Sequence, residues 1–119
     1  MIMSMVKICP APGKDQEILD ILLSVRGPTL AASGCIECSI YEEHDDEHAI
    51  VYVERWKLKG ALIDHIRSAL YTRVLKSLEL SVRQPEICFY EISGTLGMDL
   101  IEKVRSSGVE TWKEKDMSF

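Results

Sequence analysis

Residues 51–71, VYVERWKLKGALIDHIRSALY, contain a strand pattern followed directly by a helix pattern. The segment from His48 to Trp56 is rich in β-branched and aromatic residues, which favours a strand. Side chains alternate along a strand, so we expect Tyr52, Glu54 and Trp56 on one face. A helix is predicted from about Lys59 to Leu80, with these residues on its inner side: Leu58, Ala61, Leu62, His65, Ile66, Ala69, Leu70 and Val74.

Upstream of this segment the sequence predicts a strand, a helix and a second strand. The first strand covers about Met3 to Cys9 and is followed by a helix from Lys14 or Asp15. Gly27-Pro28 is expected to end that helix. The next strand is CIECSIYEE, residues 35–43, in which Ile36, Cys38 and Ile40 are expected to face inward. A short polar turn then joins it to the 48–56 strand as a hairpin.

Downstream, a fourth strand is predicted over Glu86 to Ser93, followed by a short helix in MDLIEKVRS, residues 98–106. The order is therefore βαββαβ, an α+β, ferredoxin-like arrangement with helices on one face of an antiparallel sheet. A second subunit packed sheet to sheet would cover the other face. We assign residues 1–95 to this domain and residues 96–119 to a helix and tail, either part of the same domain or a dimer arm.

The composition excludes several classes of protein. The chain has 119 residues, which fits one domain, and a formal net charge of −5 with dispersed basic residues, which argues against nucleic-acid binding. No stretch is long and apolar enough to span a membrane, and the beginning of the sequence lacks the pattern of a signal peptide. We therefore expect no membrane partner and a cytoplasmic location.

Three segments resemble one protein family. They are Pro12-Gly13-Lys14, the SGCIECSIYE run of residues 33–42, and a strand ending Glu54-x-Trp56 before a helix with Ala61-Leu62-x-x-His65-x-x-Ser68. In this order they resemble the antibiotic-biosynthesis monooxygenase family, over roughly Val6 to Ile92. The resemblance implies a homodimeric α+β barrel with a pocket between sheet and helices. It also implies enzymes that oxygenate anthrones and quinols without metal or flavin, so no cofactor and no metal are predicted.

Two positions depart from the family pattern. Many relatives carry a second His five residues after the first, where this chain has Leu70. Haem-degrading members use an Asn on the first strand, and Val6-Lys7-Ile8-Cys9 offers none, which argues against haem breakdown.

The candidate catalytic residues are His65, Trp56 and Glu54. A His can act as base toward a phenol at neutral pH, although a hydrogen-bonded core His is an equally ordinary role. Trp56 would form an aromatic pocket wall or simply fill the core. Glu54 would orient His65 or serve as a structural carboxylate paired with an Arg. The candidate substrate contacts are Tyr52, Ser68, Tyr71 and Tyr41, with surface or helix-edge positions as the alternative.

Two further motifs favour structural roles. Cys35 and Cys38 form C-x-x-C within a strand, where residues three apart are expected on opposite faces, so neither a disulfide nor a shared metal is predicted. His44 and His48 flank residues 45–47 in a segment that suggests a solvated turn rather than a metal loop. Trp112 in the tail could dock on a partner subunit.

The function that these observations favour is cofactor-independent monooxygenation of a small quinol- or anthrone-like aromatic, with molecular oxygen as second substrate. Two alternatives remain open at this point. One is a dimer that binds a small molecule without turnover, which the missing second His favours. The other is an isomerase that uses His65 as a proton shuttle.

Overall fold

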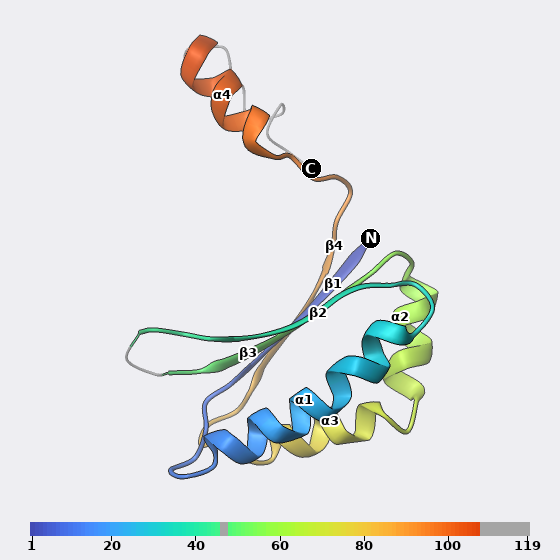
Figure 1. Cartoon of the computed structure of the whole chain (residues 1–119), viewed down its shortest axis with the longest axis vertical. Helices are drawn as coiled ribbons and strands as arrows, with labels where there is room; N and C mark the ends of the chain where they lie inside the picture. Colours follow the sequence, from blue (N-terminus) through green and yellow to red (C-terminus); the bar gives the residue numbers. More distant parts are fainter. Residues whose placement is uncertain (46–47, 108–119) are drawn as a thin grey trace.

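The computed structural model describes residues 1–45 and 48–107. Within these ranges the chain forms four strands and four helices, in the order shown in Figure 1. Their bounds are β1 Ile2–Ile8, α1 Asp15–Ala31, β2 Cys35–Glu42, β3 Ile50–Trp56, α2 Lys59–Arg67, α3 Tyr71–Leu78, β4 Glu86–Glu91 and α4 Met98–Ser107.

The strands form one antiparallel sheet in the order β2-β3-β1-β4. Helices α1, α2 and α3 lie together on one side of this sheet, while α4 lies beyond its end (Figure 1). This arrangement confirms the ferredoxin-like α+β fold that the sequence predicts. None of the helices in the described ranges is long and apolar enough to cross a membrane. Trp112 lies outside the described residues.

Helix α1 does not end at Gly27-Pro28, as predicted, but continues to Ala31. Pro28 is exposed, and so is Ser24, the residue whose carbonyl loses its helical hydrogen bond to Pro28. The buried face continues past it, because Thr29 follows Val25 at helical spacing and is itself fully buried. Burial of this face therefore outweighs the two helix-breaking residues.

The predicted helix over residues 59–80 is in fact two helices, α2 and α3. Ser68 is extended at ψ 156°, and its hydroxyl donates to the carbonyl of His65 at 2.6 Å, which ends α2. Val74 is buried, as predicted, and the break changes the orientation of two other residues. Tyr71 enters the core from α3, whereas Ile66, predicted to be inward, is exposed.

Strand β2 contains an irregularity between Cys35 and Glu37 that shifts its register against β3. Ile36 lies at this bulge and is 39% exposed, which contradicts its predicted inward orientation. The bulge also corrects the prediction for the cysteines. Cys35 and Cys38 both pack against the core on the helix-covered side instead of pointing to opposite faces.

A buried row of polar side chains crosses the helix-covered face of the sheet. It consists of Cys38, Glu54 and Ser4, which are register partners on β2, β3 and β1, and we call it the polar row. A small apolar cluster of Ile2, Trp56 and Leu62 lies on one side of the row. The larger cluster, which joins these strands to α1 and α3, lies on the other.

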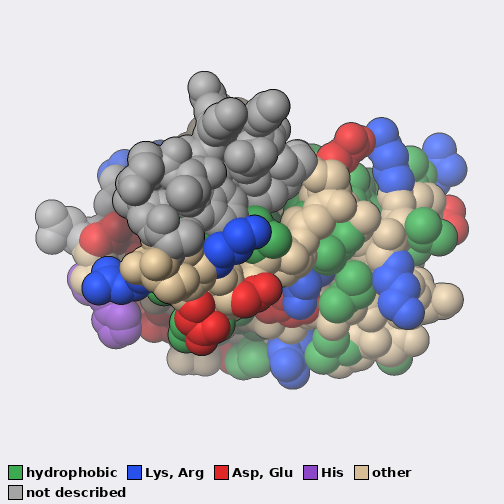
Figure 2. Space-filling view, turned by 90° about the horizontal axis from the view of Figure 1, so that it is seen from above, with side chains coloured by type: hydrophobic (Ala, Val, Ile, Leu, Met, Phe, Trp, Pro, Cys, Tyr) green, Lys and Arg blue, Asp and Glu red, His purple; other side chains and the backbone are tan. Residues whose placement is uncertain are grey.

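Charges of both signs occur on the face shown in Figure 2, where the described Lys and Arg side chains are interspersed with Asp and Glu and neither sign forms an extended patch.

Candidate functional site

A pocket of about 480 Å³ opens where the end of α1, the end of β3 and helix α2 meet. Its lining residues are Ala32, Ser33, Trp56, Ala61, Asp64, His65, Ser68 and Leu70. Gly34 brings two of these segments together. It has φ +87°, and a Cβ built on it would lie 3.0 Å from the Cβ of Ala61, so only glycine fits without strain. The small residues around the mouth leave room for a ligand.

Glu54 is the polar centre beneath this pocket and is fully buried. Its carboxylate accepts hydrogen bonds from the Tyr52 hydroxyl at 2.5 Å and from Trp56 Nε1 at 2.9 Å, and it contacts His65 Nε2 at 3.0 Å. A buried carboxylate without partners would be costly, so these three contacts explain how the core tolerates it. The predicted alternation of Tyr52, Glu54 and Trp56 on one face is what brings them together.

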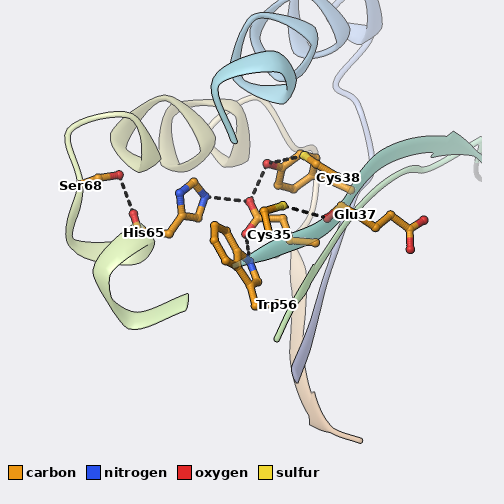
Figure 3. A network of polar contacts seen from close by, with 8 residues as sticks. Cys35, Glu37, Cys38, Trp56, His65 and Ser68 are labelled. Carbon is orange, nitrogen blue, oxygen red and sulfur yellow. Dashed lines mark hydrogen bonds and ion pairs between the residues drawn. The ribbon is translucent and has the colours of Figure 1, made fainter. Parts of the chain in front are cut away.

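His65 connects the buried carboxylate with the pocket. Its ring lies against Trp56, with centroids 4.9 Å apart, and meets the edge of Tyr71 at 5.3 Å. Figure 3 shows the rings of His65 and Trp56 pointing toward one another. Among the described residues Nδ1 of His65 has no hydrogen-bond partner, while Nε2 contacts Glu54. A proton held on Nε2 by the carboxylate leaves the Nδ1 lone pair free as a base.

Tyr52 lies behind Glu54 and does not line the pocket, which differs from its predicted role as a substrate contact. Its hydroxyl donates to Glu54 and accepts from the Cys38 thiol at 3.2 Å. Burial, followed by the charge of Glu54, raises the pKa of Tyr52. Burial also raises the pKa of Cys38 to about 12. Both groups therefore remain protonated donors.

Of the other predicted substrate contacts, the structure places some at the pocket and one away from it. Ser68 lines the pocket, although its hydroxyl donates to the carbonyl of His65. Tyr71 is buried against the His65 ring, and burial raises its pKa to about 12. Tyr41 lies further along β2 and on the opposite face of the sheet from the site. It is 52% exposed there, and its hydroxyl donates to Glu37 at 3.2 Å. The structure therefore does not bring Tyr41 to this pocket, because its parity along β2 differs from that of Cys38.

Some site residues were missed by the sequence analysis. Among the described residues that line the pocket, Asp64 is the one with an acidic side chain. Its place next to His65 in the sequence was a signal that could have identified it. Ala32 and Ser33 carry no sequence signal, since their place at the mouth depends on the close approach at Gly34. Leu70 does line the pocket, so the position of the missing family His lies at the site.

Metal binding finds no support in the described part of the chain, where no group of three or more His, Cys, Asp or Glu side chains could hold an ion. His48 lies in the left-handed region at φ 49°. Residues 46 and 47 of the turn between the two histidines lie outside the described ranges.

Comparison with known proteins gives the family. A family model for antibiotic biosynthesis monooxygenase matches residues 1–77, and the chain belongs to this family. An uncharacterized Synechocystis protein, sll1783, is 28% identical over 85 residues, which cover 71% of this chain and 58% of that protein. The chain thus spans little more than half the length of this relative.

Solved structures agree with the fold. A conserved protein from Methanosarcina mazei is 31% identical, with a TM-score of 0.69 over 76% of this chain and 90% of that one. Rv0793 from Mycobacterium tuberculosis is 23% identical, with a TM-score of 0.72 over 81% and 98% of the two chains. A Deinococcus radiodurans protein attributed to the same family is 19% identical, with a TM-score of 0.74 over 82% and 98%. These relatives share the fold, and their names specify no substrate.

Proposed function

We propose that the chain is a cofactor-independent monooxygenase that oxidises a small quinol- or anthrone-like aromatic with molecular oxygen. The observation that carries this proposal is the arrangement of His65, whose Nε2 contacts the buried Glu54 while its Nδ1 is left free at a pocket. A carboxylate that holds an imidazole in one tautomer is a common way to make its other nitrogen a base. Family membership makes oxygen chemistry a reasonable use of that base, although fold alone does not define the reaction.

In the proposed reaction His65 Nδ1 removes the hydroxyl proton of the bound phenol or enol. The resulting electron-rich anion reduces oxygen directly. One oxygen atom becomes the new carbonyl of the product, the other leaves as water, and the substrate loses two hydrogens. Trp56 would form the aromatic wall of the pocket and exclude water, because its N–H is already donated to Glu54. Glu54 would stabilise the imidazolium that forms during proton transfer.

Oxygen uptake tests this proposal. The protein, freed of metal and flavin, would be given a panel of quinols and anthrones, beside His65→Ala and a matched control, His44→Ala, which changes an exposed histidine of the hairpin turn. We expect uptake above the autoxidation rate for the unchanged chain and for His44→Ala, and a fall of about 100- to 10,000-fold for His65→Ala. Equal uptake in all three proteins would exclude His65 as the base.

A binding function without turnover is favoured by one observation: Leu70 lines the pocket where many relatives have a second His. This function predicts a ligand-dependent rise in melting temperature with no oxygen uptake and no product. An isomerase that uses the same base predicts product formation under argon. Anaerobic incubation with the panel therefore separates both alternatives from the oxygenase.

We further propose a homodimer formed through the helix-free face of the sheet, in a cytoplasmic protein whose four cysteines are all free thiols. Met3, Met5 and Val51 lie on that face, and every residue of β4 is exposed. Residues 96–107 could act as an arm on the partner. Light scattering of the full chain, of Met5→Glu and of a chain ending at residue 95 tests this. A monomer at micromolar concentration in the full chain would contradict the dimer.

A further inference from the structure

We propose that Tyr52 is a positioning residue of this site: acting through Glu54, it limits how strongly the carboxylate holds the protonated His65 ring. Its importance for the reaction rests on the proposed role of His65 as base. Its effect on the ring itself does not, and can be measured without a substrate.

Two donors share one carboxylate oxygen. The Tyr52 hydroxyl lies 2.5 Å from Oε2 of Glu54, and Nε2 of His65 lies 3.0 Å from the same atom. The shorter contact is in the range of strong hydrogen bonds from a hydroxyl to a carboxylate. Because Tyr52 takes up part of the charge on this oxygen, less of it is available to stabilise an imidazolium. A carboxylate without this competitor would hold the proton on His65 more tightly.

The neighbours of Tyr52 and Glu54 fix the direction of the hydrogen bonds that these two residues make. The Cys38 thiol donates to the Tyr52 oxygen, and Trp56, which can only donate, occupies the other carboxylate oxygen. Tyr52 is fully buried and stays protonated, so its hydroxyl remains available to donate to Glu54. With Tyr52 and Trp56 both donating, Glu54 is held as an acceptor toward His65. The proton between Glu54 and His65 therefore belongs on Nε2 of the ring.

Other titratable groups also surround His65 and contribute to its proton affinity. They are Glu54 and Tyr52 from β3, Cys35 and Cys38 from β2, Tyr71 from α3 and Asp64 beside it on α2. Tyr52 is distinguished among them because its hydroxyl bonds the same oxygen as the ring.

Nitrogen NMR of the full chain, with the His65 signal assigned by its loss in His65→Ala, tests this inference. We expect the neutral ring to carry its proton on Nε2. In Tyr52→Phe the apparent pKa of the His65–Glu54 pair should rise by about half to one unit, a three- to tenfold gain in proton affinity. The matched control is Tyr41→Phe, which removes a tyrosine hydroxyl on the opposite face and should leave the titration unchanged.

A second variant, Cys38→Ala, keeps the Tyr52 ring in place and removes only the thiol that supports its hydroxyl. It should shift the titration in the same direction by a smaller amount, and it provides the test if Tyr52→Phe folds poorly. An unchanged or lowered pKa in the folded variants, or a neutral ring protonated on Nδ1, would overturn the inference.

The pH–rate profile gives a further readout once a substrate is known. Since the base must be unprotonated, its acidic limb should move to higher pH in Tyr52→Phe by the same amount as the NMR titration. If the NMR shifts are as expected but no substrate gives oxygen uptake, the result counts against the proposed function and not against the inference. Oxygen uptake that depends on His65, with no shift in Tyr52→Phe, would count against the inference alone.

Discussion

The variant Glu54→Gln should keep the fold of this protein and lose most of its proposed activity. The amide has one oxygen and one NH2 group in place of two carboxylate oxygens. The oxygen can still accept from Trp56 Nε1, which can only donate. The NH2 group then points to where Tyr52 and His65 now donate. Both partners can adapt: the Tyr52 oxygen can accept, and His65 can accept on Nε2 if its proton moves to Nδ1.

The two expected magnitudes therefore differ greatly. Trp56, Tyr52 and His65 each keep a hydrogen bond to the amide, and the Tyr52 hydroxyl can turn its proton to the Cys38 sulfur, so the free energy of unfolding should fall by only about 1 kcal/mol. The proton on Nδ1, however, would occupy the nitrogen that faces the pocket, and the rate should fall by about 100- to 10,000-fold. Glu54→Leu is the contrasting variant. It leaves the Trp56 and Tyr52 donors buried without an acceptor, at about 1–3 kcal/mol each.

Urea unfolding and oxygen uptake, measured on the same preparations, check this prediction. Nitrogen NMR of Glu54→Gln should show the neutral His65 ring protonated on Nδ1. An undiminished rate in Glu54→Gln would refute the view that Glu54 sets the tautomer of the base. Loss of the fold in this variant would refute the hydrogen-bond exchange described above.

Three further predictions concern single residues. Gly34→Ala should destabilise the fold by about 1–3 kcal/mol in urea unfolding, because its φ of +87° and the 3.0 Å approach to Ala61 leave no room for a Cβ; an unchanged midpoint would contradict this. Ser4→Ala should be neutral or stabilise by about 1 kcal/mol, since the buried Ser4 hydroxyl has no hydrogen-bond partner among the described residues; a clear loss of stability would indicate a bound water. At pH 8 an alkylating reagent should modify the exposed Cys88 and spare Cys38, whose buried thiol has a pKa of about 12; rapid labelling of Cys38 in the folded chain would show that it is accessible.

The sequence was sufficient for the features that depend on local periodicity. The order of strands and helices follows from it, as does the shared face of Tyr52, Glu54 and Trp56, because strand side chains alternate whatever lies around them. The sequence left two roles open for Glu54: a partner of His65, or a structural carboxylate paired with an Arg. The contact of 3.0 Å between Glu54 and His65 supports the first.

Features that depend on packing or on a partner strand could not be predicted in this way. Nothing in the sequence near Ser68 resembles a helix end, since no glycine or proline lies there, and the break follows from a hydroxyl that bonds the backbone. The bulge in β2 is defined only by its pairing with β3, so the orientations of Ile36 and Cys35 were predicted wrongly. Pro28 was given too much weight because its exposure was unknown.

The polar row affects how the ligand preference of such a protein can change during evolution. It separates the small cluster of Ile2, Trp56 and Leu62 from the larger cluster that holds most of the buried apolar residues. The pocket lining includes Trp56 from the small cluster and Leu70, which packs against the larger one, and its mouth is made by Ser33 and Ala61. Replacements at the mouth can therefore change which ligand fits without disturbing the main core. Ligand preference and thermal tolerance could in this way evolve almost independently within the same chain.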